Sequence, residues 1–293
     1  MIFFPKEQKK SMSFKFDRDY DLLTQHAPVS KEKLEEFRHY NNRLFFPSTF
    51  GFLNAHNGLR PGCFHGLVGT LGSGKSSLIK AIITQTAEVC KVGVLLTEEK
   101  PIQYQMGINL SNESQDVLDN IVFLDDKNIS KITRSPSEFM TYLSMMIVSE
   151  GIKAVFIDNI TTGSFYGDHI PFAQQKKAID VLMEVMQKTG ALIFYVAHTK
   201  SDVTDNMPRL LTPEDIRGNK MLPIVTEYFY TMQKFEGSEK QYNVVRICKH
   251  RYHEKAVGFF QLEYEGGRYT KDFKVPFESV NSIFKERDRL GKT

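Results

Sequence analysis

The sequence predicts an α/β fold, in which a mostly parallel sheet is flanked by helices and followed by a C-terminal β-hairpin region. Three observations predict it. Short apolar runs alternate with helical patterns between residues 64 and 197, a glycine-rich loop joins the first run to a helix, and β-type runs dominate after residue 225. Alternation of this kind is typical of parallel strands, because a crossover connection must return the chain to the same edge of the sheet.

The predicted strands are short and rich in branched apolar residues, as expected for strands buried on both faces. The clearest helix between them runs from Gln174 to Lys188, where apolar residues recur every three or four positions. A Glu-Gly-Gly-Arg turn before Tyr269 closes the last β-type run as a hairpin. The predicted strands are Phe64–Val68, Val92–Leu96, Ile121–Leu124, Ala154–Ile157, Ala191–Val196, Val225–Met232, Tyr242–Cys248 and Val257–Tyr264.

The 293 residues fit one large domain with short appendages. We interpret residues 1–45 as an N-terminal arm that ends in a docking helix with Ser30 as its N-cap. The apolar stripe of this helix is narrow, so it packs either on its own domain or on a neighbouring subunit. Residues 46–275 form the main domain, and residues 276–293 form a charged C-terminal tail.

Composition is that of an ordinary soluble protein. The net charge of +3 is too small to indicate nucleic-acid binding by itself. The longest apolar run, Ala191–Ala197, is far shorter than the roughly 20 residues that a membrane span requires, so no membrane partner is expected. Three widely spaced cysteines give neither a disulfide framework nor a zinc pattern. The expected location is the cytoplasm.

A phosphate-binding loop follows the first predicted strand. Residues 69–76 match the pattern G-x-x-x-x-G-K-[ST] in its required context between a strand and a helix. Its glycines let successive N–H groups surround phosphate oxygens, and the helix N-terminus adds further N–H groups. We predict that ATP is bound here and that Lys75 reaches its β- and γ-phosphates while Ser76 binds Mg²⁺. The predicted binding residues are Gly69, Thr70, Leu71, Gly72, Ser73, Gly74, Lys75, Ser76 and Ser77.

Acidic residues end two neighbouring predicted strands, at the edge where open α/β sheets bind ligands. Glu98 and Glu99 follow one strand, and a carboxylate there would polarise the water that attacks the γ-phosphate. The alternative is that these two glutamates are solvated charges of a loop and have no catalytic role. Asp158 ends another strand in the manner of a Walker B acid, which holds Mg²⁺ through water. Which glutamate is the base stays open, although Glu98 lies nearer the strand end.

A histidine, His198, ends the next predicted strand. A polar side chain at this position would hydrogen-bond the γ-phosphate and sense its presence, whereas a histidine in a lone apolar strand is usually structural. The loop, the acids and this histidine together indicate a nucleoside triphosphatase of the P-loop class.

Four local patterns resemble the DnaB-type hexameric helicases, a group of RecA-like P-loop ATPases, over about residues 45–270. Phe46–Gly62 is similar to the lead-in before their phosphate loop, and Ala197–Lys200 to the sensor strand of phage primase-helicases and small plasmid RepA helicases. Asp215–Lys220 resembles their D-x-R-G/E-S-x loop, and Lys249-His-Arg251 their K-x-R strand. The pair of glutamates is also similar to that of the related KaiC-like and RadA-like ATPases.

The resemblance implies a RecA-like fold and an ATP-driven ring that translocates 5′–3′ on single-stranded DNA as a replicative helicase does, with a loader or primase protein as a further partner. It also implies that Arg251 is an arginine finger for a neighbouring subunit of a hexamer, with Lys249 as its companion. Side chains two residues apart on a strand project to the same face. The alternative for this pair is an exposed basic face.

The resemblance assigns DNA contact to two loops, Thr161–Gln174 and Lys200–Leu222. Phe165 and Tyr166 of the first are candidates for stacking on bases. The second is near neutral in charge, and its basic residues are Lys200, Arg209, Arg217 and Lys220. Two alternatives stay open: a KaiC- or RadA-like regulatory or recombination ATPase that does not unwind DNA, and a scaffold in which ATP only holds a ring together.

Overall fold

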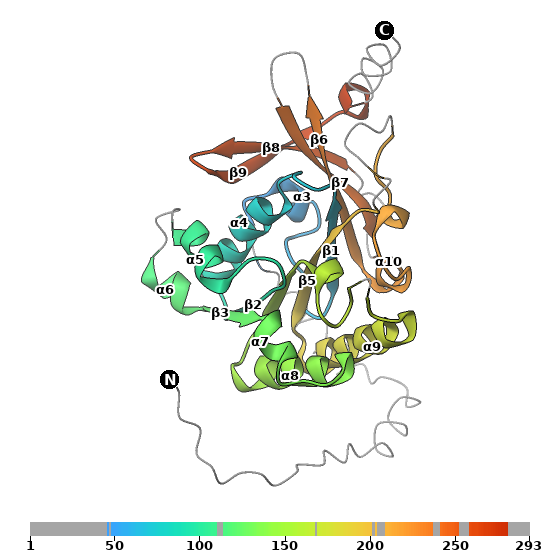
Figure 1. The fold of residues 1–293 in the computed structure, drawn as a ribbon. Helices are drawn as coiled ribbons and strands as arrows, with labels where there is room; N and C mark the ends of the chain where they lie inside the picture. Colours follow the sequence, from blue (N-terminus) through green and yellow to red (C-terminus); the bar gives the residue numbers. More distant parts are fainter. Residues whose placement is uncertain are drawn as a thin grey trace, which may run out of the picture. The chain divides into compact units, whose positions relative to one another are not determined.

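One mixed sheet runs through the described part of the chain in the strand order β3-β2-β4-β5-β1-β6-β7-β8-β9 (Figure 1). The computed structural model describes residues 46, 48–109, 114–167, 169–200, 203, 209–236, 241–251 and 258–280. The first six strands in this order, from β3 through β1 to β6, are parallel to their neighbours. The pairs β6–β7, β7–β8 and β8–β9 are antiparallel. The predicted fold class is therefore confirmed. The predicted N-terminal arm and docking helix (residues 1–45), and most of the predicted tail, lie outside the described residues.

The strands follow the predicted pattern closely, with small extensions at their ends. The five parallel strands β1–β5 each lie within one or two residues of their predicted bounds. The observed strands are β1 Phe64–Gly69, β2 Val92–Leu96, β3 Ile121–Asp125, β4 Ala154–Asp158, β5 Leu192–His198, β6 Tyr228–Glu236, β7 Gln241–His250, β8 Gly258–Glu265 and β9 Arg268–Val275.

The predicted start of the sixth strand at Val225 was wrong, because Val225 is the last residue of helix α10 (Met221–Val225). The N–H and the hydroxyl of Thr226 donate to the Leu222 carbonyl at 3.1 and 2.6 Å, which keeps this segment in a helical turn. Pairing with β1 begins only at Glu227, whose N–H donates to Phe64. Val257, predicted to begin the eighth strand, lies outside the described residues.

Helices cover both faces of the sheet, as Figure 1 shows for α4 and α9. Successive residues of β5 alternate between two cores: Phe194 and Val196 pack with α4, and Ile193 and Tyr195 pack with α8 and α9. No helix within the described ranges combines the length and the apolar character needed to span a bilayer. The helices are α3 Gly51–Asn54, α4 Lys75–Ala87, α5 Pro101–Asn109, α6 Gln115–Asp119, α7 Asp126–Ser130, α8 Pro136–Ser149, α9 Phe172–Thr189 and α10.

The β8–β9 hairpin extends from the sheet and packs against α3 and α4 (Figure 1). Gly266 and Gly267 both have positive φ, 59° and 86°, which the tight hairpin turn requires and which glycine adopts without strain. The carboxylate of Asp272 on β9 accepts hydrogen bonds from the N–H groups of Gly51 and Phe52, at the start of α3. These contacts attach the hairpin to α3.

His65 of β1 and His56, just after α3, share the hydroxyl of Tyr230 on β6. The hydroxyl oxygen lies 3.2 Å from Nδ1 of His65 and 2.7 Å from Nε2 of His56. Nε2 of His65 accepts from the Arg60 N–H, so Nδ1 of His65 carries the proton and donates to Tyr230. Nδ1 of His56 lies 2.7 Å from the Leu53 carbonyl, which can only accept. In this chain of hydrogen bonds the ring of His65 is neutral.

We expect the free energy of unfolding to decrease as the pH falls below about 6.5, the ordinary pKa of histidine. Burial, and then the neighbouring His56, lower the pKa of His65 well below that value. The unfolded chain therefore binds a proton that the native protein does not, so this contribution is complete above pH 6.5 and is lost progressively below it. Urea unfolding at pH 8, 6.5 and 5.5 measures the effect. His65→Phe keeps a ring beside Tyr228 and removes the titrating group, so its pH dependence should be shallower; an equal slope would contradict the assignment.

Candidate active site

The carboxyl ends of β2, β4, β5 and β1 lie side by side, because these strands are parallel neighbours in the sheet. Asp158 at the end of β4 is the register partner of Leu96 on β2. His198 at the end of β5 is the register partner of Gly69, where the phosphate-binding loop begins. The structure thus brings the predicted acids, histidine and loop to one edge of the sheet.

The phosphate-binding loop joins β1 to α4 with the backbone that its glycines permit. Gly72 and Gly74 have φ values of 77° and 89°, and Gly74 is the N-cap of α4. A Cβ on Gly69 would lie 2.6 Å from the carbonyl oxygen of Met232 on β6, so only glycine fits there. The buried Lys75 ammonium donates to the Thr70 carbonyl at 2.6 Å, within the same loop. The loop thereby holds the Lys75 ammonium beside its own backbone, where a bound phosphate would need a cation.

The other loop residues divide between the interior and the surface. Ser73 is buried, and its hydroxyl donates to the Thr70 carbonyl at 2.9 Å. Leu71 is 83% exposed at the tip of the loop. Ser77 lies one residue beyond Ser76 on α4 and lines the cavity described below.

The predicted magnesium residues lie together. The hydroxyl of Ser76 at the start of α4 donates to the Asp158 carboxylate at 3.4 Å. Burial, helped by the nearby Glu98 carboxylate, raises the pKa of Asp158 to about 6 against the lowering effect of the hydrogen bond from Ser76. A buried carboxylate beside a hydroxyl, with two further acceptor oxygens expected from a nucleotide, suits the hard oxygen preference of Mg²⁺. The residues present therefore fit this ion.

The two glutamates after β2 have different partners. Oε1 of Glu98 lies 3.0 Å from Nε2 of His198, and this hydrogen bond is the main reason that the pKa of Glu98 is lowered. The charge of Lys75 also lowers this pKa. Glu99 instead forms a 3.0 Å ion pair with Lys80 on α4. The geometry favours Glu98 as the base and gives Glu99 a structural partner.

A network of threonines that no sequence pattern indicated lies behind these groups. The Thr97 hydroxyl accepts from the Asn159 N–H at 2.9 Å and lies 2.7 Å from the Thr162 hydroxyl, which ties the end of β2 to the segment after β4. The Thr161 hydroxyl accepts from the His198 N–H at 3.2 Å. Lys80 was missed as well, although its position four residues after Ser76 places it on the same face of the helix.

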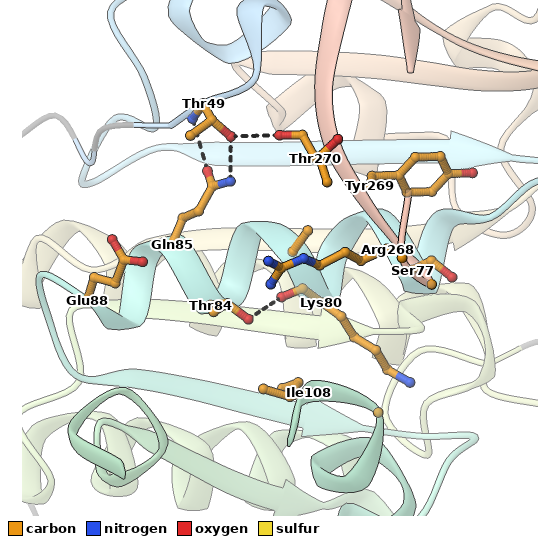
Figure 2. Close-up of a pocket in the computed structure, with 14 residues that line it drawn as sticks. Thr49, Ser77, Lys80, Thr84, Gln85, Glu88, Ile108, Arg268, Tyr269 and Thr270 are labelled. Carbon is orange, nitrogen blue, oxygen red and sulfur yellow. Dashed lines mark hydrogen bonds between the residues drawn. The ribbon is translucent and has the colours of Figure 1, made fainter. Parts of the chain in front are cut away.

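A cavity of about 630 Å³ lies along α4, beginning beside the phosphate-binding loop at Ser77 and reaching Glu88 (Figure 2). Residues Gly266–Thr270 of the β8–β9 hairpin form the wall above α4, and Gly107 and Ile108 of α5 form the opposite wall. Figure 2 shows Arg268 and Tyr269 lying against the helix. The volume is in the range of small-molecule sites in proteins.

The predicted stacking role of Phe165 and Tyr166 was wrong, because both side chains are almost completely buried. Phe165 stacks on Phe139 of α8, with 4.8 Å between ring centroids. The Tyr166 hydroxyl donates to the Asn219 carbonyl at 3.0 Å. The buried Asp126 accepts from the N–H and hydroxyl of Ser164 and so holds this loop on the domain. These aromatic rings belong to the core and cannot stack on bases.

The basic residues of the second loop do not share one environment. Arg209 forms a two-point ion pair with the buried Asp215, at 2.6 and 2.7 Å, which occupies its guanidinium. Lys200, Arg217 and Lys220 have exposed side chains. The backbones of Lys200 and Arg217 flank the antiparallel bridge between Thr199 and Ile216, and the Arg217 N–H donates to the His198 carbonyl at 3.0 Å. Lys200 and Arg217 are thus attached directly to the end of β5.

Lys249 and Arg251 lie at the other edge of the sheet from the phosphate-binding loop. Met232 of β6 pairs with both Gly69 and Val245, whereas Lys249 pairs with Phe229 and the Arg251 N–H donates to the Glu227 carbonyl, three and five residues back along β6, or about 10 and 17 Å. Lys249 donates to the carbonyls of Pro223 and Ile224, and Arg251 forms a 3.3 Å ion pair with Glu227. Neither side chain can reach the loop of its own chain.

Neither a protein-family profile nor a curated protein matches the sequence. Among solved structures, the chain is similar to a KaiC-like protein from the hyperthermophilic archaeon Pyrococcus horikoshii OT3, with a TM-score of 0.59 and 15% sequence identity. The alignment covers 80% of this chain and 99% of the archaeal protein. At this identity the likeness establishes a RecA-like fold.

Proposed function

We propose that this protein is a Mg²⁺-dependent ATPase that acts as a ring of identical subunits and moves along single-stranded DNA. The observation that carries the ATPase assignment is the convergence of Lys75, Ser76, Glu98, Asp158 and His198 at one sheet edge. The triphosphate would lie in the loop, and the nucleoside in the cavity that begins at Ser77.

In this proposal each residue at the sheet edge has one task. The loop N–H groups and Lys75 hold the β- and γ-phosphates, and Ser76 and Asp158 hold Mg²⁺, which neutralises phosphate charge. Glu98 orients the attacking water and accepts its proton. His198 contacts Glu98 at 3.0 Å. When ATP is bound, His198 would release this carboxylate and form a hydrogen bond with the γ-phosphate instead. Catalysis and detection of the γ-phosphate would therefore share one pair of side chains.

The position of Arg251 supports a ring. Its backbone is level with Glu227, about 17 Å along β6 from the residue that pairs with its own phosphate loop, so we expect it to meet a γ-phosphate only in a neighbouring subunit. A head-to-tail contact between the two sheet edges is heterologous, and such contacts close into rings when the rotation permits. Lys249, on the same segment, would accompany Arg251. A hexamer is the ring size implied by the resemblance to DnaB-type helicases.

The role in DNA movement is supported by the attachment of Lys200 and Arg217 to the end of β5. Any displacement of His198 by ATP would move these cations, because the backbones of His198 and Arg217 share a hydrogen bond. A loader or primase protein would be a further partner of such a motor.

A second candidate is a KaiC- or RadA-like regulatory or recombination ATPase that does not unwind DNA. Two observations favour it: Phe165 and Tyr166 are buried, and the guanidinium of Arg209 is already paired with Asp215. Both reduce the surface available for bases and phosphates. This candidate shares the ATPase site with the first, so only the effect of DNA separates the two.

We expect single-stranded DNA to stimulate ATP turnover severalfold, and added salt to weaken the stimulation because phosphate contacts release counterions. The measurement is the steady-state ATPase rate with and without a single-stranded oligonucleotide at low and moderate salt. Arg217→Ala should require more DNA for half-maximal stimulation. Lys188→Ala, on α9 just before β5 and hence at the opposite edge of the sheet, is the matched control and should behave as wild type. A rate indifferent to DNA would favour the regulatory ATPase.

A further inference from the structure

Tyr104 of α5 is completely buried next to the site but belongs to none of the motifs. Its ring packs edge-on against Phe123 of β3, with 6.2 Å between centroids, and the Lys80 ammonium lies 4.3 Å from the ring centroid. These contacts explain why an aromatic ring is present. They do not explain why it carries a hydroxyl group.

The hydroxyl oxygen of Tyr104 is buried and makes no hydrogen bond of ordinary distance and angle with the described residues. An unsatisfied buried polar group destabilises a fold, and native structures contain few of them. Burial raises the pKa of this phenol, and the adjacent carboxylates of Asp158 and then Glu99 raise it further. Two acceptors are therefore near the hydroxyl, and it donates fully to neither.

Of these two acceptors, Asp158 is the more available. Glu99 is already paired with Lys80, which lies 3.0 and 3.3 Å from its two carboxylate oxygens. Within the described residues, Asp158 receives one side-chain hydrogen bond, the long one of 3.4 Å from Ser76. A carboxylate accepts up to about four hydrogen bonds, so a single long one leaves its rotation weakly defined.

We propose that Tyr104 is a positioning residue whose hydroxyl donates to the Asp158 carboxylate and orients it toward the Mg²⁺ ion that accompanies the nucleotide. The inference rests on the proposed ATPase function. It explains why a hydroxyl group is buried at this point, and it gives the metal site an outer hydrogen bond of the kind that commonly fixes ligand orientation. The rigid ring, held by Phe123 and Lys80, delivers the donor at little entropic cost.

The test uses Tyr104→Phe, which removes the hydroxyl and keeps the ring. We expect the Mg²⁺ concentration for half-maximal binding of a fluorescent, non-hydrolysable ATP analogue to rise about tenfold. Binding of the analogue in excess EDTA should be unchanged, because the phosphate-binding loop is intact. The melting temperature should not fall, since the hydroxyl makes no hydrogen bond of ordinary distance and angle with the described residues.

Tyr195→Phe is the matched control. Its hydroxyl is equally buried but lies 2.7 Å from the Thr226 hydroxyl, which itself donates to Leu222, so Tyr195 is the donor. This variant should lower the melting temperature and leave the Mg²⁺ titration unchanged. If Tyr104→Phe shows the wild-type Mg²⁺ dependence, or loses affinity equally with and without Mg²⁺, the positioning role is overturned. A wild-type protein that binds no analogue in either condition would overturn the proposed function as well.

Discussion

Arg251→Ala is expected to reduce ATP turnover by about 10³-fold or more while nucleotide binding stays close to that of wild type. An arginine that neutralises charge on the transferred phosphoryl group acts mainly in the transition state, so its loss lowers the catalytic rate rather than substrate affinity. The structure adds a constraint, because Arg251 lies at the opposite edge of the sheet from its own loop. Steady-state turnover and fluorescent-nucleotide binding measure the two effects separately.

Mixing two inactive variants tests the action between subunits. Lys75→Ala lacks a working phosphate loop but keeps Arg251, and Arg251→Ala has the reverse defect. Mixed assemblies contain contacts where an intact loop meets an intact arginine, so turnover should return to a fraction of wild type. Two variants that stay inactive together would contradict the role in trans. Arg251→Lys is the stability control, since it keeps a positive charge beside the largely buried Glu227 but loses the guanidinium fork.

Glu98→Gln is expected to lower turnover by about 10²- to 10⁴-fold, the usual contribution of a general base. Glutamine keeps the size of the side chain and can still bond His198, but it cannot accept the proton of the attacking water. Glu99→Gln should stay within a fewfold of wild type, because Glu99 is bound to Lys80 on α4. Single-turnover hydrolysis at saturating ATP compares the two variants without the effects of binding.

The two glutamine variants serve as controls for each other, since they are adjacent and isosteric. If both variants turn over ATP at equal, near-wild-type rates, neither glutamate is the base. A larger loss of turnover in Glu99→Gln than in Glu98→Gln would identify Glu99 as the base. Its ion pair with Lys80 would then hold the base while it is not acting. In either case, near-native melting temperatures establish that the chemical step, and not folding, was changed.

Local patterns predicted most of the fold and the core of the candidate site. The strands follow from branched apolar runs, and the loop follows from a motif whose glycines have a fixed conformational reason, as at Gly72 and Gly74. The choice between Glu98 and Glu99 could not be predicted, because it depends on His198, which lies 100 positions away, and on Lys80. Such pairings arise from the order of strands in the sheet and leave no mark on the local sequence.

The errors have the same physical origin. The resemblance assigned DNA contact to the loop of Phe165, yet this loop folds back onto α8 and buries the ring against Phe139. Arg209 was predicted to contact nucleic acid, yet its guanidinium is paired with the buried Asp215. The strand expected from Val225 was displaced by the helical turn that Thr226 completes. Composition describes what a loop contains, whereas packing decides which groups remain available.

The separation of the phosphate-binding loop from Arg251 across one sheet has a consequence for how the protein would behave on dilution. If each catalytic centre takes its loop from one chain and its arginine from the next, a lone chain contains two half-sites and no complete one. Specific activity would then be a property of the assembly, and it would fall as the protein concentration drops below the dissociation constant of the subunit contact. The abundance of the chain in a cell would itself act as a control on hydrolysis, without any separate inhibitor.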